Sequence, residues 1–514
     1  MSSAPSVSSN DSCRWLLVAV CLAAMAMPIS FTGPAVALPV IQTALGGTPV
    51  QLNWVTNAFM LSFGATLMAA GALADAHGRR RLFLGGLLLV IASGLALACV
   101  QGIVAFDLLR AVQGLGCAAA FAGGTAGLAQ VVQGSARTRA FSFIGTSFGA
   151  GLALGPLLSG WLSDAAGWRA VVMTPGLISA VALGIGARWM TESRAPAPGR
   201  LDWPGMLAFT AALSLLTVGV LQAPDSGWTH PLVLGSLAAA ASAGFIFVAI
   251  ERRVARLGGA PMLDLSLFRY PRFVGVQLLA AAPAYGFVVL LVLLPIRFIG
   301  LEGRDALEAG RFMLLLSAPV LVIPSVAAVL ARRFSAGRIA AAGLLVCAAG
   351  LAWLSTCAPG SGLARLAGPL LAIGIGIGLP WGLMDGLAVS VVPRERAGMA
   401  SGIFNTVRVA GEGIALALVG AGLTALVASQ LAHLPGTAAV AAVAAQRVTT
   451  GDMAQVLALL PGVDRGAVLQ AYGRAFATLL EVLAAVTAAT AFVILAFLRD
   501  PAPARVEVSA AECA

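Results

Sequence analysis

Fourteen runs of apolar residues follow one another along this chain of 514 residues, and their length is what most constrains its fold. About 20 helical residues cross a hydrocarbon core that is about 30 Å thick. A backbone in lipid has no water to bond to, so a run of this length predicts a helix, which pairs its own N–H and C=O groups. The runs lie at 15–39, 50–74, 82–100, 106–132, 140–163, 170–190, 204–222, 231–250, 274–298, 311–331, 338–357, 365–392, 403–428 and 476–498. The chain is 59% hydrophobic and only 10% charged, so we predict an all-α polytopic membrane protein with one transmembrane helix per run.

The arginines indicate how these helices are oriented. All 31 basic residues are arginine, and the net charge is +10. They stand between apolar runs rather than on one stripe, which argues against a nucleic-acid partner and agrees with the excess of basic residues in cytoplasmic loops. Clusters at 79–81, 252–256 and 332–338 all fall inside if the N-terminus is cytoplasmic. We therefore expect a multi-pass protein of a bacterial inner membrane with both termini in the cytoplasm.

Metal, cofactor and enzyme chemistry find no support in the sequence. The seven cysteines stand singly and the three histidines do not cluster, so neither paired nor metal-ligand spacing is present. The phosphate-binding pattern GxxxxGK[ST] is absent, which excludes ATP as the energy source. We expect no metal and no cofactor, and a membrane enzyme is the least favoured function.

The loop GALADAHGRRR, between the second and third runs, combines a carboxylate with three consecutive arginines. Gly71, Asp75, Gly78, Arg79 and Arg80 resemble the GxLaDrxGrkr motif that joins spans 2 and 3 of major facilitator superfamily transporters. The resemblance implies a cytoplasmic gate. Gly71 would permit close approach of helices, and Asp75 could accept from backbone N–H groups or from an arginine. The alternative is a charge cluster that only fixes the orientation.

The fourth run begins FDLLRAVQGLGCAAA and resembles the RxxQGxGaA motif of the same family at Arg110, Gln113, Gly114 and Gly116. An arginine inside a span costs at least ~2.5 kcal/mol unless it faces a partner within the protein. Asp107 stands three residues earlier on the same helix face and is the expected partner. The pair predicts a proton relay in which protonation of the carboxylate frees the guanidinium. A static, charge-compensated pair is the alternative.

The fifth run, GTSFGAGLALGPLLSG, resembles the glycine and proline motif of proton-coupled antiporters at Gly151, Gly155 and Pro156. Glycines four residues apart form a groove for close helix packing, and proline removes one backbone hydrogen bond and leaves a kink. We predict a span that bends at the interface between two bundles. A groove that serves only packing is the alternative.

The first run departs from the family pattern. MAMPISFTGPAVALP resembles the fourteen-span branch of the family, but Ser30 stands where those relatives usually carry an aspartate. Proton coupling would then depend on other carboxylates inside the membrane. Arg408 and Glu412 are four residues apart on one helix face, which also fits a structural pair. The coupling candidates are Asp107, Arg110, Asp385, Arg408, Glu412 and Glu481.

A cavity for an amphipathic ligand needs aromatic faces and a few polar groups. Taken alone, each aromatic or amide side chain in these runs more often faces lipid or another helix. The candidates for the cavity wall are Phe31, Asn57, Gln113, Tyr285, Trp381 and Asn405.

A weak internal repeat suggests two related halves, because VLARRFSAGR at 329–338 echoes LADAHGRRR at 73–81. With the family resemblance it implies a major facilitator fold of two six-helix bundles plus an inserted two-helix hairpin. Short alanine-rich helical pieces are expected in the long outside loop. The expected division is a cytoplasmic tail at 1–14, the N-terminal bundle at 15–190, a linker with inserted helices at 191–250, a cytoplasmic linker at 251–273, the C-terminal bundle at 274–498 with its outside loop at 429–474, and a cytoplasmic tail at 499–514.

The resemblance covers nearly the whole chain and implies proton-coupled export of amphipathic drugs or toxic compounds across the inner membrane by alternating access. The expected partners are a small amphipathic substrate, protons and the lipid bilayer, and the protein is expected to be monomeric. Two alternatives remain open: an exporter or symporter of a specific metabolite, and a membrane sensor that does not transport. The motif in the fifth run, which symporters typically lack, argues against a symporter, and we find no appended signalling domain.

Overall fold

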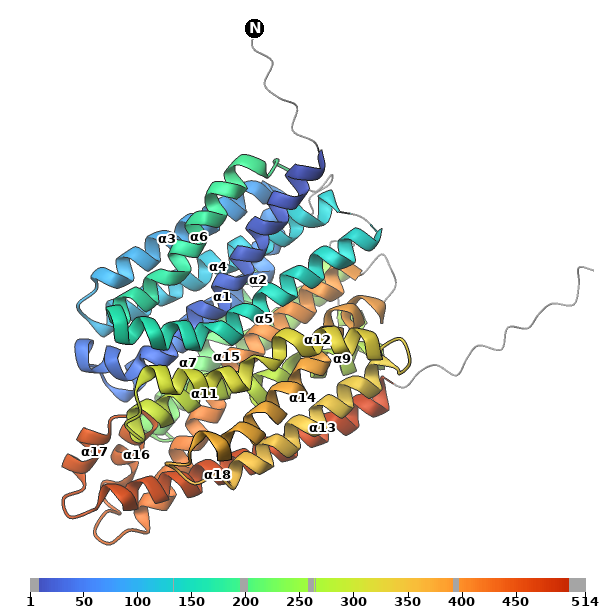
Figure 1. The fold of residues 1–514 in the computed structure, drawn as a ribbon. Coiled ribbons are helices and arrows are strands. Elements are labelled where there is room, and N and C mark those ends of the chain that lie inside the picture. Colours follow the sequence, from blue (N-terminus) through green and yellow to red (C-terminus); the bar gives the residue numbers. More distant parts are fainter. Residues whose placement is uncertain are drawn as a thin grey trace, which may run out of the picture.

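The computed structural model describes residues 9–132, 134–194, 202–257, 263, 265–391 and 397–498. Within these ranges, 14 helices are long and apolar enough to cross a membrane. They lie side by side along one direction of the molecule (Figure 1). The predicted all-α membrane fold is therefore confirmed.

The first six spans form one bundle. In it α1 packs against α5 and α6, both α2 and α3 pack against α4, and α3 packs against α6. The helices are α1 (Ser9–Leu45), α2 (Pro49–His77), α3 (Arg79–Cys99), α4 (Ile103–Val131), α5 (Gly134–Ala166) and α6 (Trp168–Trp189). Several extend beyond the apolar run that predicts them: α1 has 37 residues, or ~55 Å at 1.5 Å per residue.

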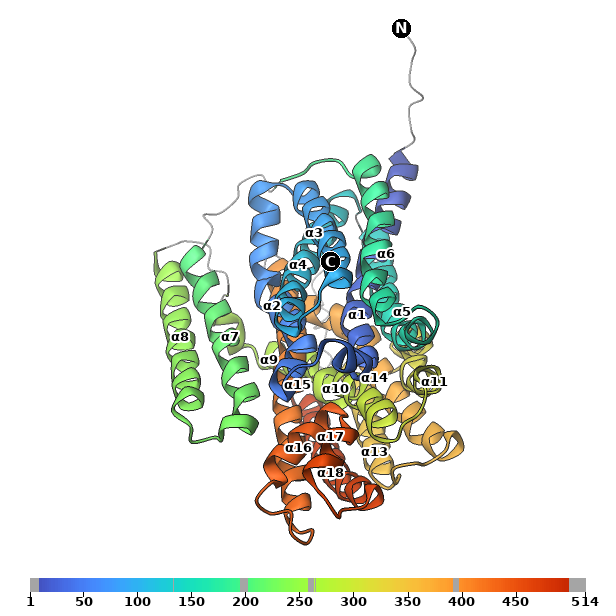
Figure 2. The ribbon, with the colours of Figure 1, turned by 90° about the vertical axis from the view of Figure 1, so that its left-hand side faces the viewer.

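The next two spans form a hairpin outside both bundles. These are α7 (Trp203–Ser226) and α8 (Pro231–Arg256). They pack against each other, and α7 also packs against α2 and α15. Figure 2 shows the hairpin standing to one side of the remaining helices. A short 3-10 helix, η1 (Leu265–Arg269), follows the hairpin.

The remaining spans form the second bundle. Here α13 packs against α14 and α18, α14 packs against α11 and α12, and α15 packs against α9 and α18. The elements are α9 (Pro271–Pro283), η2 (Ala284–Val288), α10 (Val289–Pro295), η3 (Ile296–Leu301), α11 (Ala306–Ser317), α12 (Pro319–Leu330), α13 (Ala336–Ser355), α14 (Leu363–Ser390), α15 (Ala397–Ala432), α16 (Ala441–Thr450), α17 (Met453–Leu459) and α18 (Arg465–Phe497).

Prolines interrupt the ninth and tenth spans in a way that periodicity does not predict. The π-helical segments η2 and η3 begin directly after Pro283 and Pro295. Proline has no N–H to donate, so the backbone hydrogen bonds shift to a wider register at these points. The tenth span is divided into α11 and α12 just before Pro319.

Two ends of the molecule are distinguished below. The terminal end is where α1 begins and α18 ends, on the right of the helices in Figure 1. At the opposite, distal end lie the short helices α16 and α17, which confirm the helical pieces expected in the long loop. In addition α18 begins at Arg465, eleven residues before the apolar run that predicts it.

Candidate functional site

The two bundles meet along α2 and α15, where small residues let the backbones touch. A Cβ atom added to Gly64 of α2 would lie 2.8 Å from Cα of Ala410 on α15. A Cβ atom added to Gly413 would lie 3.4 Å from Cβ of Met60 on α2. Surfaces of small residues are how membrane helices approach each other closely. The two bundles therefore approach each other closely where α2 meets α15.

Arg110 of α4 lies inside the N-terminal bundle, with 1% of its surface exposed. Its Nε donates to the carbonyl of Val55 on α2 at 2.9 Å, and another of its nitrogens donates to Gln113. The guanidinium carbon lies 4.7 Å from the ring centroid of Phe59. Gly114 makes this arrangement possible, because a side chain there would overlap the backbone of α2 at Phe59. Neutral groups of α2 and α4 thus hold the arginine.

The predicted ion pair between Asp107 and Arg110 is wrong. These two residues, both of which the structure describes, form no ion pair. Oδ1 of Asp107 is buried and has no hydrogen-bond partner within the described ranges. Positions three apart on a helix differ by ~60° around its axis. That rotation directs Arg110 into the bundle and Asp107 into a groove on the side of α4.

Ser30 of α1 stands where the fourteen-span branch of the family usually carries an aspartate, and its side chain is neutral. It is fully buried, and its hydroxyl donates to the carbonyl of Ala26 at 2.8 Å. A side-chain hydrogen bond also joins it to Cys117 of α4. The first span therefore brings no carboxylate to this position.

A second buried arginine lies on α15, close to the N-terminal bundle. Arg408 is 6% exposed and Glu412 is 2% exposed. Arg408 donates to Asn405 at 2.8 Å, and its guanidinium lies 5.7 Å from the ring centroid of Phe148 on α5. Oε1 of Glu412 has no hydrogen-bond partner among the described residues. The side chain of Asp385, on α14, lies outside the described part of the chain.

The three motif residues of α5, Gly151, Gly155 and Pro156, face in two directions. A Cβ atom added to Gly155 would lie 2.5 Å from Oγ1 of Thr32 on α1, and one added to Gly151 would overlap α1 as well. Both glycines therefore pack α5 within its own bundle. The carbonyl of Pro156 faces the other bundle instead, 3.2 Å from a Cβ atom added to Gly310 of α11. Of the three motif residues, Pro156 is the one that meets the interface.

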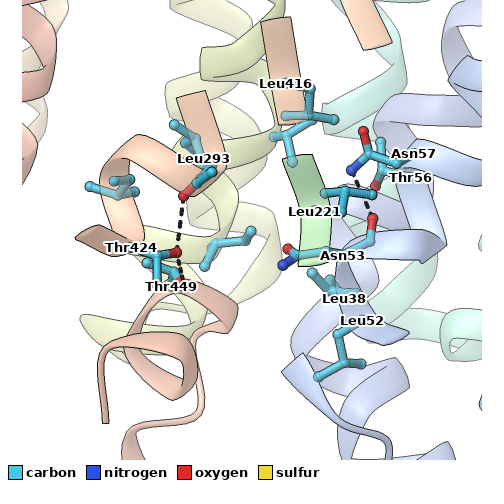
Figure 3. A pocket seen from close by; sticks show the side chains of 15 residues that line it. Leu38, Leu52, Asn53, Thr56, Asn57, Leu221, Leu293, Leu416, Thr424 and Thr449 are labelled. Carbon is cyan, nitrogen blue, oxygen red and sulfur yellow. Dashed lines mark hydrogen bonds between the residues drawn. The ribbon is translucent and has the colours of Figure 1, made fainter. Parts of the chain in front are cut away.

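A narrow crevice lies between the bundles toward the distal end (Figure 3). Asn53 and Asn57 of α2 line one side, and Thr424 of α15 and Thr449 of α16 line the other. Oδ1 of Asn57 has no partner among the described atoms. The volume of about 40 Å³ holds a water or two, because each needs about 30 Å³. A drug-sized ligand needs at least ~300 Å³, so the crevice is too small to hold one.

The other predicted cavity residues lie in different surroundings. Phe31 is buried in the core. The ring of Trp381 lies 6.1 Å from that of Phe148 on α5, centroid to centroid, and so it does contact the interface. Tyr285 is directed within its own bundle, with its hydroxyl 2.6 Å from Oγ1 of Thr490 on α18.

Glu481 differs from the other acidic candidates because it is exposed. It lies on the face of α18 that carries the exposed apolar residues Val482 and Val486. This face points away from the bundle interface, toward lipid.

Two polar contacts join the bundles at the distal end. Nε2 of Gln42, near the end of α1, donates to Asp452 between α16 and α17 at 2.6 Å. The backbone N–H of Leu307, at the start of α11, donates to Asp164 at the end of α5 at 3.2 Å. An anionic acceptor at the start of a helix is favourable because the helix dipole is positive there. These contacts hold the distal end closed.

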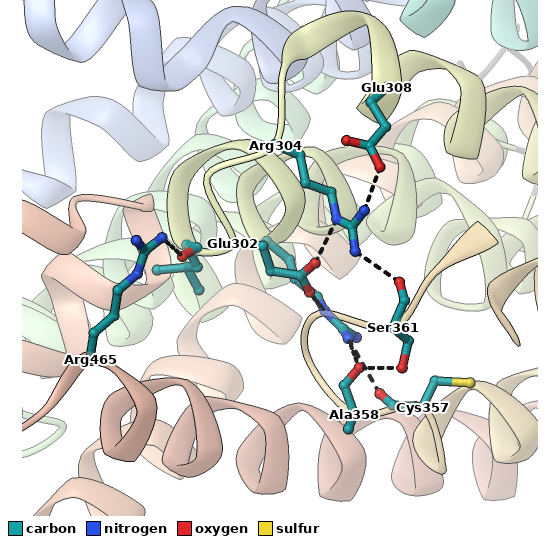
Figure 4. Close-up of polar contacts among 9 residues, drawn as sticks. Glu302, Arg304, Glu308, Cys357, Ala358, Ser361 and Arg465 are labelled. Atoms are coloured by element: carbon teal, nitrogen blue, oxygen red, sulfur yellow. Dashed lines mark hydrogen bonds and ion pairs between the residues drawn. The ribbon is translucent and has the colours of Figure 1, made fainter.

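A buried ion pair organises the distal end of the second bundle (Figure 4). Arg297 is 1% exposed, and its Nε donates to Glu302 at 2.8 Å. The same guanidinium donates to the carbonyl of Ala358, in the loop between α13 and α14, at 3.0 Å. It also lies 5.4 Å from the ring centroid of Phe476 on α18. Sequence analysis overlooked this pair, although an arginine within the ninth apolar run is a signal of the same kind as Arg110.

A second arginine extends this network. Arg304 donates to the other oxygen of Glu302 at 2.9 Å and to Glu308 at 2.5 Å. It also donates to the carbonyl of Ser361 at 2.9 Å. Burial alone would lower the pKa of Arg304, but hydrogen bonds to Glu302 and Glu308 outweigh it and raise the pKa above its ordinary value. The network therefore joins the start of α11 to the loop between α13 and α14.

The loop between α2 and α3 is organised by a carboxylate that sequence analysis did not name. Glu192, after α6, accepts from the backbone N–H of Arg80 at 3.1 Å and thereby caps the start of α3. Gly78 has φ +120°, and an added Cβ atom would lie 2.6 Å from Glu192, so glycine is required there. Asp75 pairs with Arg79 of its own loop at 2.6 Å. Gly71 has open space around it, so the expectation that it permits close helix approach is wrong.

Comparison with known proteins gives consistent results. A family model described as the Major Facilitator Superfamily matches residues 18–416. The chain is 32% identical over 421 residues to the cephamycin export protein CmcT of Amycolatopsis lactamdurans, covering 80% of this chain and 85% of that protein. It is 31% identical over 398 residues to the multidrug resistance protein Stp of Mycobacterium tuberculosis, covering 77% of this chain and 73% of that protein.

The fold is also found among solved structures. A bacterial homologue of the human lysosomal transporter Spinster, in an inward-facing and unoccupied conformation, matches with a TM-score of 0.63 at 16% sequence identity. The match covers 96% of this chain and 99% of that one. At this identity the likeness shows the shared fold alone.

Proposed function

This chain belongs to the Major Facilitator Superfamily, and on that premise we propose that it exports amphipathic drugs across a bacterial inner membrane in exchange for protons. The names of its relatives, a cephamycin export protein and a multidrug resistance protein, support drug export. A proton that moves inward down 100 mV releases about 2.3 kcal/mol. In our proposal that energy drives each export cycle.

The observation that carries the proposal is the buried carboxylate of Glu412 on α15, the helix that packs against α2 of the other bundle. It lies one helical turn from Arg408, and one of its oxygens has no hydrogen-bond partner among the described residues. A buried carboxylate is costly when charged and unpaired, so protonation and pairing are the two ways to lower its cost. We propose that Glu412 carries the proton in one conformer and is paired in the other. Asp385 is the second candidate, because it lies on the neighbouring helix α14.

Alternating access is supported by the contacts between the bundles. They meet through small residues on α2 and α15 and through Pro156 and Gly310 on α5 and α11. Such surfaces can slide without leaving a large side chain in the way. The contacts of Gln42 and Asp164 close the distal end. We propose that this conformer is closed to the outside, with the terminal end in the cytoplasm, and that export requires both contacts to break.

Export of one dedicated compound is the second candidate, and the relative CmcT, named for cephamycin export, favours it. A multidrug exporter and a dedicated exporter differ in how many classes of compound they transport. A strain that lacks the protein and one that overproduces it are compared for susceptibility to a panel of unrelated amphipathic antibiotics. Changes across several classes support multidrug export, whereas a change in one class supports a dedicated exporter.

The proposal is tested in inverted membrane vesicles that contain the protein. Ethidium accumulation is followed by fluorescence after a pH gradient, acidic inside, is imposed. We expect accumulation that collapses when nigericin removes the gradient, and none in vesicles without the protein. Accumulation that survives when nigericin and valinomycin together remove both the pH gradient and the membrane potential would contradict proton exchange.

A further inference from the structure

A groove on the side of the N-terminal bundle is large enough for a ligand, unlike the crevice between the bundles. Its volume is about 440 Å³, which falls within the ~300–1,000 Å³ of ligand pockets. The helix α2 forms its floor, with Ala58, Ser62 and Thr66 facing the groove. On either side stand α4, through Asp107, and α7, through Thr210. The groove therefore exists only because the α7–α8 hairpin lies beside α2.

The groove opens to the lipid. On α4, the side chains that line it next to Asp107 are the exposed residues Val104, Leu108 and Leu115, whose exposed fractions are 56%, 64% and 40%. These side chains belong to a span of mean hydropathy 1.5, so their exposed surface faces hydrocarbon. A ligand would reach the groove from the bilayer, in the half of the membrane near the distal end, where α4 begins.

One charged group points into this apolar groove. Asp107 lies one turn after the start of α4, and its Oδ1 is buried with no hydrogen-bond partner within the described ranges. Arg110, ~60° away around the helix, donates to Val55 and Gln113 and forms no ion pair with it. The hydroxyls of Ser62 and Thr66 donate to their own helix backbone and not to the carboxylate. The groove thus offers a carboxyl group in apolar surroundings that forms no ion pair within the described ranges.

We propose that this groove binds the positively charged end of an amphipathic cation that arrives from the bilayer, with Asp107 as its counter-charge. The apolar body of the ligand lies along Ala58, Leu61 and Ala65 of α2. A cation of this kind has two sources: an exported compound dissolved in the membrane, or a phospholipid with an amine head group. The inference concerns a site for collecting substrate and rests on the proposed export function only for its biological meaning.

The test uses TMA-DPH, a trimethylammonium amphiphile that resides in membranes, and DPH, its neutral analogue. Purified protein in phosphatidylglycerol nanodiscs is titrated with each, and binding is followed by energy transfer from tryptophan. We expect Asp107→Asn to weaken TMA-DPH binding by about 10-fold, the loss of one partly desolvated ion pair, and to leave DPH binding unchanged. Asp107→Glu keeps the charge and should bind TMA-DPH within about threefold of the natural protein.

Two further variants keep the inference falsifiable if Asp107→Asn folds poorly. Ala111→Trp fills the groove from α4 and should weaken both probes. Glu481→Gln removes an exposed carboxylate from the lipid-facing side of α18 and should change neither. Equal binding of TMA-DPH by the natural protein and by folded Asp107→Asn, or an equal loss of both probes in Asp107→Asn, would overturn the inference.

A second nanodisc preparation identifies the source of the cation. Phosphatidylethanolamine is added to the phosphatidylglycerol lipid, and the TMA-DPH titration is repeated. Competition by this amine lipid, seen in the natural protein and lost in Asp107→Asn, supports a resident lipid. Binding that is unaffected by the amine lipid supports collection of an exported cation. Because no proton gradient is present, the result is independent of whether Glu412 couples transport to protons.

Discussion

Replacement of Gly151 by alanine should destabilise the N-terminal bundle. An added Cβ atom would overlap the backbone carbonyl of Met25 and the ring of Pro28 on α1. Neither can yield cheaply, because one is backbone and the other a rigid ring, so α1 and α5 must move apart. Overpacking of this kind typically costs ~1–3 kcal/mol. The expected outcome is a protein that inserts normally but unfolds at a lower temperature.

The matched control is Gly145→Ala, six residues earlier on the same helix. A Cβ atom at Gly145 would meet no other atom within 4 Å. There alanine should be neutral or stabilising by ~0.5–1 kcal/mol, because it restricts the unfolded backbone more than glycine does. Any difference between the two variants therefore reports the contact with α1 and not a general effect of helix propensity.

The assay heats each purified variant in detergent and measures by size-exclusion chromatography the fraction that stays monodisperse. We expect the midpoint for Gly151→Ala to fall by several degrees and that for Gly145→Ala to stay or rise. Equal midpoints would refute the packing argument. If Gly151→Ala were fully stable but unable to transport, Gly151 would be needed for the bending predicted for this span and not for packing.

Three further outcomes are expected. Arg110→Lys should lower the transport rate per inserted molecule at least ~10-fold in the vesicle assay. A lysine cannot donate to Val55 and Gln113 at once from two separate nitrogens, as the guanidinium does. An unchanged rate would mean that these contacts are dispensable. Asp164→Ala removes the acceptor for the backbone N–H of Leu307 in the first turn of α11, a contact worth ~1 kcal/mol. Double electron–electron resonance between labels across the distal end should then show about fivefold more of the open conformer. An unaltered distance distribution would contradict the role of this contact in closing the distal end. Glu302→Gln leaves Arg297 buried without its anion, which should lower the free energy of unfolding by ~3–5 kcal/mol and sharply reduce the yield of folded protein. Glu308→Gln removes one partner of a half-exposed pair and should lower it by under ~1 kcal/mol. Equal yields of the two variants would show that the network does not stabilise the fold.

The fold could be predicted from sequence because the bilayer leaves few choices to a chain with apolar runs of this length. The fourteen helices and the family followed from run length and from three short motifs. The ends of the helices did not follow, because polar residues continue α1 and α18 beyond the bilayer. Nor did the π-helical turns after Pro283 and Pro295, which depend on how the tertiary fold satisfies the freed carbonyls.

The site was predictable only in part, because spacing along a helix fixes a direction but not the neighbour that lies there. Arg110 and Glu412 are buried, as residues of their kind in a span should be. The partner assigned to Arg110 was wrong, since Arg110 reaches a backbone carbonyl of α2 whereas Asp107, ~60° away around α4, faces a groove. Glu192 and Asp164 could not be found at all, because each acts on a backbone N–H far away in the sequence.

The central claim is that a buried carboxylate exchanges a proton for an exported drug, and the release of protons from purified protein tests it most directly. Detergent-solubilised protein in weakly buffered solution is mixed with ethidium, and the pH is recorded with a soluble indicator. We predict that binding releases protons from the natural protein, that Glu412→Gln abolishes the release while ethidium still binds, and that Glu481→Gln releases as many protons as the natural protein. Undiminished release from Glu412→Gln, or no release from the natural protein when ethidium binds, would contradict the claim.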